Sequence, residues 1–135
     1  MTAERDLDAL LSNMKPEILD GVFAFCSLAP GASIPAGISP MLTFREREGT
    51  TLVVLQQEAE RAGLHHECPS RLITLTVNSA LDAVGFLAAV TARLAEAGIS
   101  VNAVSAFHHD HLFVPVDRAD EAMALLHDGF MPKRD

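Results

Sequence analysis

A run of four residues, His108-His-Asp-His111, gathers the side chains of this chain that are best suited to chemistry. On an extended segment His109 and His111 point to the same side, a spacing that can serve a metal ion such as Zn²⁺. A structural zinc site usually takes four ligands and a catalytic site three, and the other histidines lie in no recognised metal-binding spacing. The cluster therefore favours a polar hairpin turn, and a metal-binding protein is kept as the second alternative.

The two cysteines, Cys26 and Cys68, are too few for a disulfide framework. A Cys68–His66 pair is conceivable as a nucleophile and its base, but no third group in the sequence orients the histidine. The sequence contains no Gly-x-Ser-x-Gly elbow, no phosphate-binding glycine loop and no dinucleotide fingerprint. We therefore expect a protein that is not an enzyme and that carries no cofactor.

The composition is that of a folded globular protein. The chain has 135 residues, of which 49% are hydrophobic, so burial can repay the entropy of ordering. The formal charge is −8 and basic residues are scattered, which excludes nucleic acid as a partner because a phosphate backbone needs a clustered positive surface. The acidic start of the chain resembles no signal peptide, and no apolar run reaches membrane-spanning length. We expect a cytoplasmic protein with no membrane partner.

Hydrophobic spacing organises the chain into short helices and strands. In the first half it predicts a helix over 6–14, a strand over 22–28, a Pro/Gly-rich loop over 29–40, a hairpin over 41–55 and a helix over 56–62. In the second half it predicts a strand over 72–77, a hairpin over 99–116 and a last helix that begins at Asp117 and buries Phe130. Between them Ser79-Ala-Leu-Asp82 has the pattern of a capping box, so we expect a helix that begins there and ends at Gly98.

The two halves are related repeats. The run Val22–Ser27 aligns with Leu72–Val77, and Leu52–Leu55 aligns with the run that begins at Leu112. The second half lacks only the last strand of a ferredoxin-like βαββαβ unit, and residues 128–135 are too short and charged to supply it. We expect that strand from the other half or from a second chain. The predicted fold is α+β, a ferredoxin-like sandwich of two divergent tandem repeats with antiparallel sheets, divided into 1–66 and 67–135. Because the strand over 72–77 is apolar on both sides, we also expect a homodimer.

Three stretches of the second half resemble the ACT domain family of small regulatory modules. They are Ser79-Ala-Leu-Asp-Ala-Val-Gly85, Leu94-Ala-Glu-Ala-Gly-Ile-Ser-Val-Asn102 and Val104-Ser-Ala-Phe-His-His-Asp-His-Leu-Phe-Val-Pro115. Within the family they are similar to the regulatory region of aspartate kinases and to the CASTOR arginine sensors. The resemblance implies a non-catalytic protein that binds an amino acid or a related small carboxylate and regulates a protein partner.

The resemblance places the ligand where the first strand of the second repeat turns into its first helix. A helix N-terminus there would offer N–H groups to a carboxylate, with Gly85 one turn inside the helix for close approach. Asp110 would hold an ammonium or guanidinium group at the other end of the ligand. The expected site residues are Asn78, Ser79, Leu81, Asp82, Ala83, Val84 and Gly85, together with Ala106, Phe107 and Asp110.

A purely structural interpretation of the same residues stays open. Ser79 and Asp82 can be helix caps, Gly85 can serve close packing, and Asp110 can be a turn residue. In that case the chain is a ligand-free module for homo-oligomerisation or protein interaction.

Overall fold

The computed structural model describes residues 3–128, which fold into two compact units. The middle unit consists of residues 21–70, and the terminal unit of residues 3–20 and 71–128. Strand β5 (Glu67–Thr76) contributes its first four residues to the middle unit and the rest to the terminal unit. The division of the sequence repeats at 66/67 stays a prediction.

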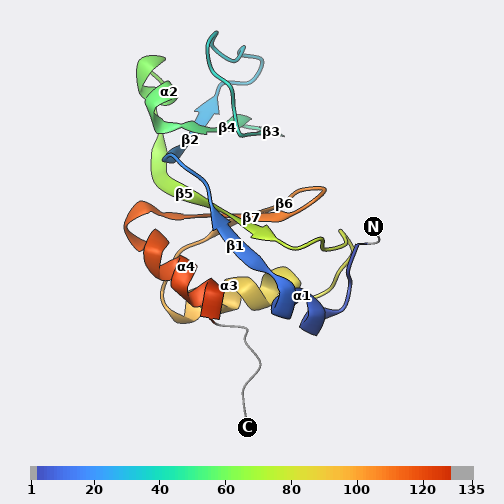
Figure 1. The fold of residues 1–135 in the computed structure, drawn as a ribbon. Coiled ribbons are helices and arrows are strands. Elements are labelled where there is room, and N and C mark those ends of the chain that lie inside the picture. Colours follow the sequence, from blue (N-terminus) through green and yellow to red (C-terminus); the bar gives the residue numbers. More distant parts are fainter. Residues whose placement is uncertain (1–2, 129–135) are drawn as a thin grey trace. The chain divides into compact units, whose positions relative to one another are not determined.

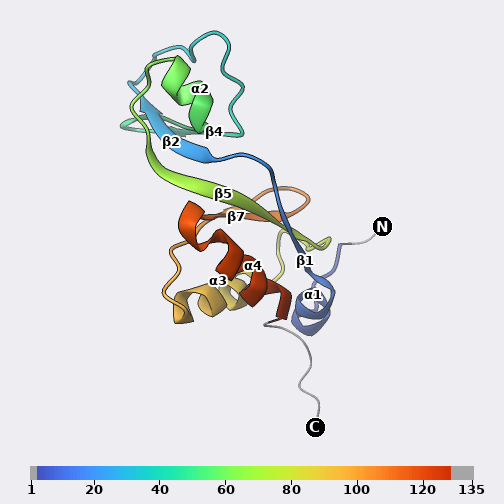
Figure 2. The same cartoon turned by 60° about the vertical axis from the view of Figure 1, so that its left-hand side comes forward.

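The middle unit is a sheet with one helix. Its strands are β2 (Phe23–Leu28), β3 (Leu42–Glu46) and β4 (Gly49–Leu55), arranged with the start of β5 in the order β3-β4-β2-β5. Helix α2 (Gln56–Arg61) covers one face (Figure 2). Ala59 of α2 shares a core with strand residues, and Ile38 of the loop after β2 packs against the same core. The residues between β2 and β3 contain no helix.

The terminal unit has a larger helical layer. Its elements are α1 (Leu7–Asn13), β1 (Lys15–Ile18), the rest of β5, α3 (Phe86–Glu96), β6 (Asn102–Ser105), β7 (Asp110–Pro115), a 3₁₀ turn η1 (Val116–Arg118) and α4 (Ala119–Asp128). The sheet order is β1-β5-β7-β6, and α1, α3 and α4 lie on one face of the sheet (Figure 1). The core between them contains Leu10, Ile73, Leu75, Val90, Leu94, Leu112, Val114 and Leu126. The predicted contribution of Phe130 lies outside the described residues.

The missing strand is supplied by the first half of the same chain. Strand β1 pairs antiparallel with β5, with Lys15 opposite Thr76 and Ile18 opposite Ile73. If β1 is counted as the fourth strand of the terminal unit, both units have the order fourth, first, third, second. The two aligned runs are then the first strands (β2 and β5) and the third strands (β4 and β7). The predicted ferredoxin-like duplication is confirmed.

The helix expected from Ser79 begins seven residues later, at Phe86. Residues 79–85 form an irregular segment because other partners satisfy the groups of the apparent capping box. The Ala80 N–H donates to the Glu4 carbonyl at 2.9 Å, and the Glu4 N–H donates to the Asn78 carbonyl at 2.8 Å. Gly85 is left-handed, with φ +91°, and forms the N-cap instead of lying inside the helix. We refer to residues 78–85 as the 78–85 loop.

Candidate functional site

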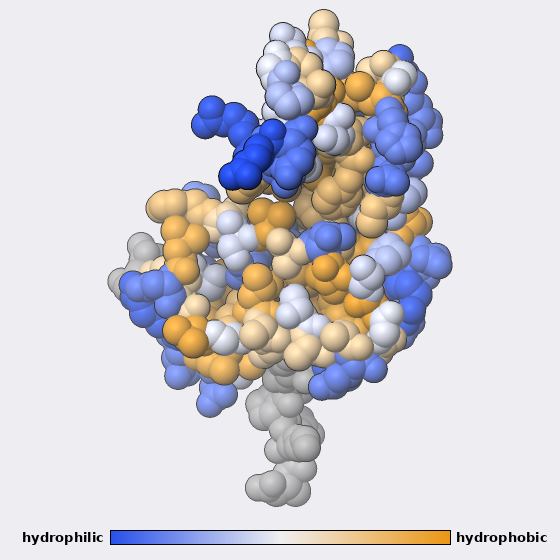
Figure 3. Space-filling model, turned by 180° about the vertical axis from the view of Figure 1, so that it is seen from behind, coloured by the Kyte–Doolittle hydropathy of each residue, from blue (hydrophilic) through white to orange (hydrophobic). Residues whose placement is uncertain are grey.

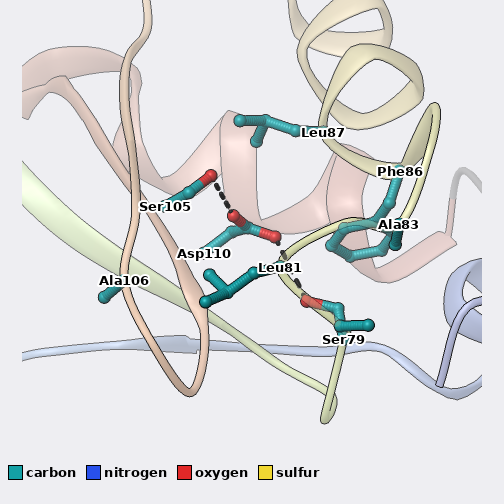
Figure 4. Close-up of a pocket in the computed structure, with 9 residues that line it drawn as sticks. Ser79, Leu81, Ala83, Phe86, Leu87, Ser105, Ala106 and Asp110 are labelled. Atoms are coloured by element: carbon teal, nitrogen blue, oxygen red, sulfur yellow. Dashed lines mark hydrogen bonds between the residues drawn. The ribbon is translucent and has the colours of Figure 1, made fainter. Parts of the chain in front are cut away.

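An inner pocket of about 60 Å³ lies between the 78–85 loop, the start of α3 and the β6–β7 hairpin (Figure 4). Three elements of the terminal unit therefore meet at the place that the sequence predicts for a ligand. Its lining consists of Ser79, Ala80, Leu81, Ala83, Phe86, Leu87, Ser105, Ala106 and Asp110.

Asp110 supplies the charge of the inner pocket. Side chains alternate along β7, and because Leu112 and Val114 are buried in the helix-side core, Asp110 also points to the helix side. Its side chain is buried, with 8% of the residue exposed. The hydroxyl of Ser105 donates to one carboxylate oxygen at 2.5 Å, and that of Ser79 donates to the other at 3.5 Å (Figure 4). A carboxylate is thus held in the pocket by hydroxyl groups, with no cation bonded to it among the described residues.

The start of α3 supplies the opposite polarity. Helical hydrogen bonding begins with the Ala89 N–H, which donates to the Gly85 carbonyl at 2.9 Å. The preceding N–H groups of a helix have no partner within the helix, and no side chain caps α3. Phe86 and Leu87 of this first turn line the inner pocket. The pocket therefore combines a helix N-terminus, which attracts anions, with a carboxylate, which attracts cations.

An outer pocket of about 570 Å³ adjoins the inner one, because both are lined by Ser79, Ala80 and Leu81. Its other lining residues are Ala3, Arg5, Asn78, Asp82, Phe107 and His108. Arg5 donates from Nε to Asp82 Oδ1 at 3.0 Å.

The structure gathers most, but not all, of the predicted site residues. Ser79, Leu81, Ala83, Ala106 and Asp110 line the inner pocket. Asn78, Asp82 and Phe107 line the outer pocket, which Ser79 and Leu81 also reach. Val84 and Gly85 line neither pocket. The helix of the site therefore begins at Phe86, after the predicted residues of the 78–85 loop rather than within them.

Sequence reasoning missed several lining residues. Ser105 was missed because the sequence places Asp110 in the turn, whereas in the structure Asp110 begins β7 and pairs with Ser105 of β6. Arg5 could not be found from the sequence, since seventy-seven residues separate it from Asp82. Phe86 and Leu87 were missed because the helix was expected to begin earlier.

The histidine cluster has structural partners. Nδ1 of His109 lies 3.2 Å from the Val77 carbonyl oxygen, and Nδ1 of His111 lies 3.0 Å from the Thr74 hydroxyl. Burial lowers the pKa of His111, and nearby His109 lowers it further, whereas Asp110 opposes the shift. Within residues 3–128, three or more metal-binding side chains do not come together at any point. The metal-binding alternative thus gains no support from this part of the chain.

Among the described residues, no hydrogen bond joins Cys68 to His66, and Cys26 is buried. Burial raises the pKa of the Cys26 thiol, which makes it less reactive. Cys68 is exposed, but its sulfur faces the Ser70 hydroxyl at 3.8 Å. Nδ1 of His66 lies against the Leu64 carbonyl oxygen at 3.1 Å.

Among the described helices, none has the length and apolar character that crossing a membrane requires.

The duplicated fold and its pocket define a class of small regulatory modules with two tandem repeats. Residues 2–71 and residues 67–128 each match the profile of the ACT domain. The chain belongs to the ACT domain family. None of the curated proteins compared with the chain matches it.

Solved structures agree with this assignment. A Vibrio cholerae protein of unknown function, described as a possible transport protein, is 41% identical, with a TM-score of 0.84 over 93% of this chain and 96% of that one. A protein from Agrobacterium tumefaciens is 23% identical, with a TM-score of 0.73 over 87% and 90%. The regulatory subunit of aspartate kinase from Thermus thermophilus is 10% identical, with a TM-score of 0.67 over 90% and 99%, and shares the fold. Family and fold together support a regulatory, ligand-binding role.

Proposed function

We propose that the protein is a sensor of a free amino acid, which binds with its main-chain groups in the inner pocket. The observation that carries the proposal is the buried Asp110 carboxylate, which shares one pocket with the uncapped start of α3. An α-amino acid carries an ammonium and a carboxylate group on one carbon. The positive ammonium is complementary to Asp110, and the negative carboxylate is complementary to the helix N-terminus.

The size of the inner pocket supports this ligand class. A water-sized group occupies about 10–15 Å³ of such a volume, so about 60 Å³ accommodates roughly four to six groups. The ammonium, α-carbon and carboxylate of an amino acid comprise about five heavy atoms, and they match this space. The α-ammonium would donate to Asp110, and the α-carboxylate would accept from the first N–H groups of α3.

The test is a thermal-shift screen of the twenty amino acids, followed by calorimetric titration of each ligand found. A ligand at tens of its dissociation constant should raise the free energy of unfolding by about 2 kcal/mol. Asp110→Asn keeps the shape of the side chain but removes its charge. It should weaken the binding of that ligand by about 10- to 100-fold, because a hydrogen bond to a charged group contributes about 1.5–3 kcal/mol.

Asp117→Asn is the matched control, because it removes one exposed negative charge from the same unit and should leave affinity unchanged. Equal affinity of the Asp110→Asn variant and the unaltered protein would contradict the proposed binding mode. If no amino acid or small organic acid shifts the unfolding curve, the ligand-free assembly module becomes the better interpretation. Light scattering then measures whether the protein forms the homodimer that we also propose.

A further inference from the structure

We propose, building on the amino-acid sensor, that the outer pocket selects a ligand side chain that is neutral and both donates and accepts hydrogen bonds, such as a carboxamide. The two pockets share Ser79, Ala80 and Leu81. In this proposal an amino acid whose main-chain groups fill the inner pocket would extend its side chain past these shared residues towards the outer pocket. At about 570 Å³ the outer pocket is within the usual range for small-molecule sites.

The charges of the outer pocket carry the argument for a neutral side chain. Its lining contains one cation, Arg5, and one carboxylate, Asp82, which are bonded to each other at 3.0 Å. His108 is the remaining titratable group of the lining. A ligand carboxylate would be attracted by Arg5 and repelled by Asp82. A ligand ammonium would be attracted by Asp82 and repelled by Arg5. Neither kind of charge gains a net advantage from this pair.

The same pair has hydrogen-bonding capacity to spare. A guanidinium group has five N–H donors, of which the bond to Asp82 uses Nε, and the Asp82 carboxylate has a second oxygen. A carboxamide can accept from Arg5 through its oxygen and donate to Asp82 through its NH₂ group. The ion pair is well exposed, with 60% and 73% of the two side chains accessible, so it can adjust to a ligand at little cost.

Two apolar side chains line the outer pocket together with this ion pair. Leu81 and Phe107 line the outer pocket and are 66% and 75% exposed, which is high for hydrophobic residues of this size. On the face of the molecule shown in Figure 3, hydrophobic and hydrophilic residues lie side by side. The methylene groups of a ligand side chain would cover part of this apolar surface. The outer pocket thus favours a side chain with an apolar stem and a polar, uncharged end.

Arg5 is held in place by the main chain around it. Glu4 forms a short parallel bridge with Ser79, through the two backbone hydrogen bonds to Asn78 and Ala80 described above. The N-terminal segment is therefore joined to the 78–85 loop next to the pocket, and Arg5 projects from a fixed backbone. This arrangement makes Arg5 a specificity-determining residue rather than a loose surface charge.

The experiment removes the charges of the ion pair one at a time. Calorimetry then measures the affinities for L-glutamine, L-glutamate, L-lysine and L-leucine. The unaltered protein should bind glutamine most tightly of the four. Asp82→Asn should improve the affinity for glutamate relative to glutamine by about two- to fivefold, the effect of removing one exposed like charge. Arg5→Gln should improve lysine relative to glutamine by a similar factor. Arg93→Gln, which removes a half-buried cation of α3 outside both pockets, is the control and should change no ratio.

The outcomes separate this inference from the proposed function. If the Asp110→Asn variant loses affinity but Arg5→Gln and Asp82→Asn leave every ratio unchanged, the inner pocket holds the ligand and the inference about the outer pocket is wrong. Tightest binding of a charged or wholly apolar amino acid to the unaltered protein would also overturn it. If none of the twenty amino acids binds, both the sensor and the selectivity are refuted.

Discussion

Replacing Leu10 by alanine tests whether the N-terminal segment belongs to the terminal unit. Leu10 is on α1, is fully buried, and shares a core with Ile73, Leu75 and Leu112. Removing a buried leucine side chain costs about 2.7–5 kcal/mol when the cavity cannot collapse. We expect Leu10→Ala to lower the free energy of unfolding by about 3 kcal/mol, a large part of a typical 5–15 kcal/mol. The midpoint of thermal unfolding should fall by roughly 10 °C.

Leu11→Ala is the matched control, because it makes the same change in the same helix at a half-buried position. It should cost about 1 kcal/mol. Hydrogen exchange followed by mass spectrometry then locates the effect, since Leu10→Ala should speed exchange in β5, β7 and α3. The reasoning is refuted if the two variants are equally stable, or if faster exchange is confined to residues 21–70.

Two further predictions concern a turn and a histidine. A side chain at Gly49 would clash with the Leu28 carbonyl, so Gly49→Ala should lower the free energy of unfolding by at least about 2 kcal/mol. The control Gly37→Ala places its methyl group in open space and should cost about 1 kcal/mol. Chemical denaturation measures both values. Because burial lowers the pKa of His111 below its ordinary 6.5, the unfolded chain binds a proton more readily, and stability should fall as the pH drops from 7 to 5. Chemical denaturation at pH 7 and at pH 5 measures this change. Between the two pH values the His111→Gln variant should lose less stability than the unaltered protein, and an equal loss would show that His111 is not the cause.

Sequence periodicity predicted the elements of this fold well where the pattern reflects burial. The apolar runs of β2 and β7 were predicted because most residues of each strand are buried. The duplication could be predicted as well, since the first and third strands of the two units retain similar apolar runs. These signals are local, and they depend on the average polarity of a position rather than on a particular partner.

The sequence misled where a local pattern competes with distant partners. Ser79 and Asp82 have the spacing of helix caps, but Ser79 bonds to Asp110 and Asp82 to Arg5. The source of the missing strand was likewise open, because nothing local to β1 indicates that it pairs with β5. Gly85 could have indicated the later start of α3. Glycine is more common at a helix boundary than in a helix interior, and in the structure Gly85 is left-handed. The position of the candidate site could thus be predicted from the sequence, but the contribution of Arg5 from the N-terminal segment could not.

The completion of one unit by strand β1 has a consequence for biosynthesis. The middle unit is encoded by one uninterrupted stretch, residues 21–70, whereas the terminal unit is encoded on both sides of it. On the ribosome the segment with β1 emerges first, but its partner in β5 is translated only after the whole insertion. The segment with β1 therefore docks late, and a gene fragment that begins after residue 20 would encode a terminal unit without its fourth strand.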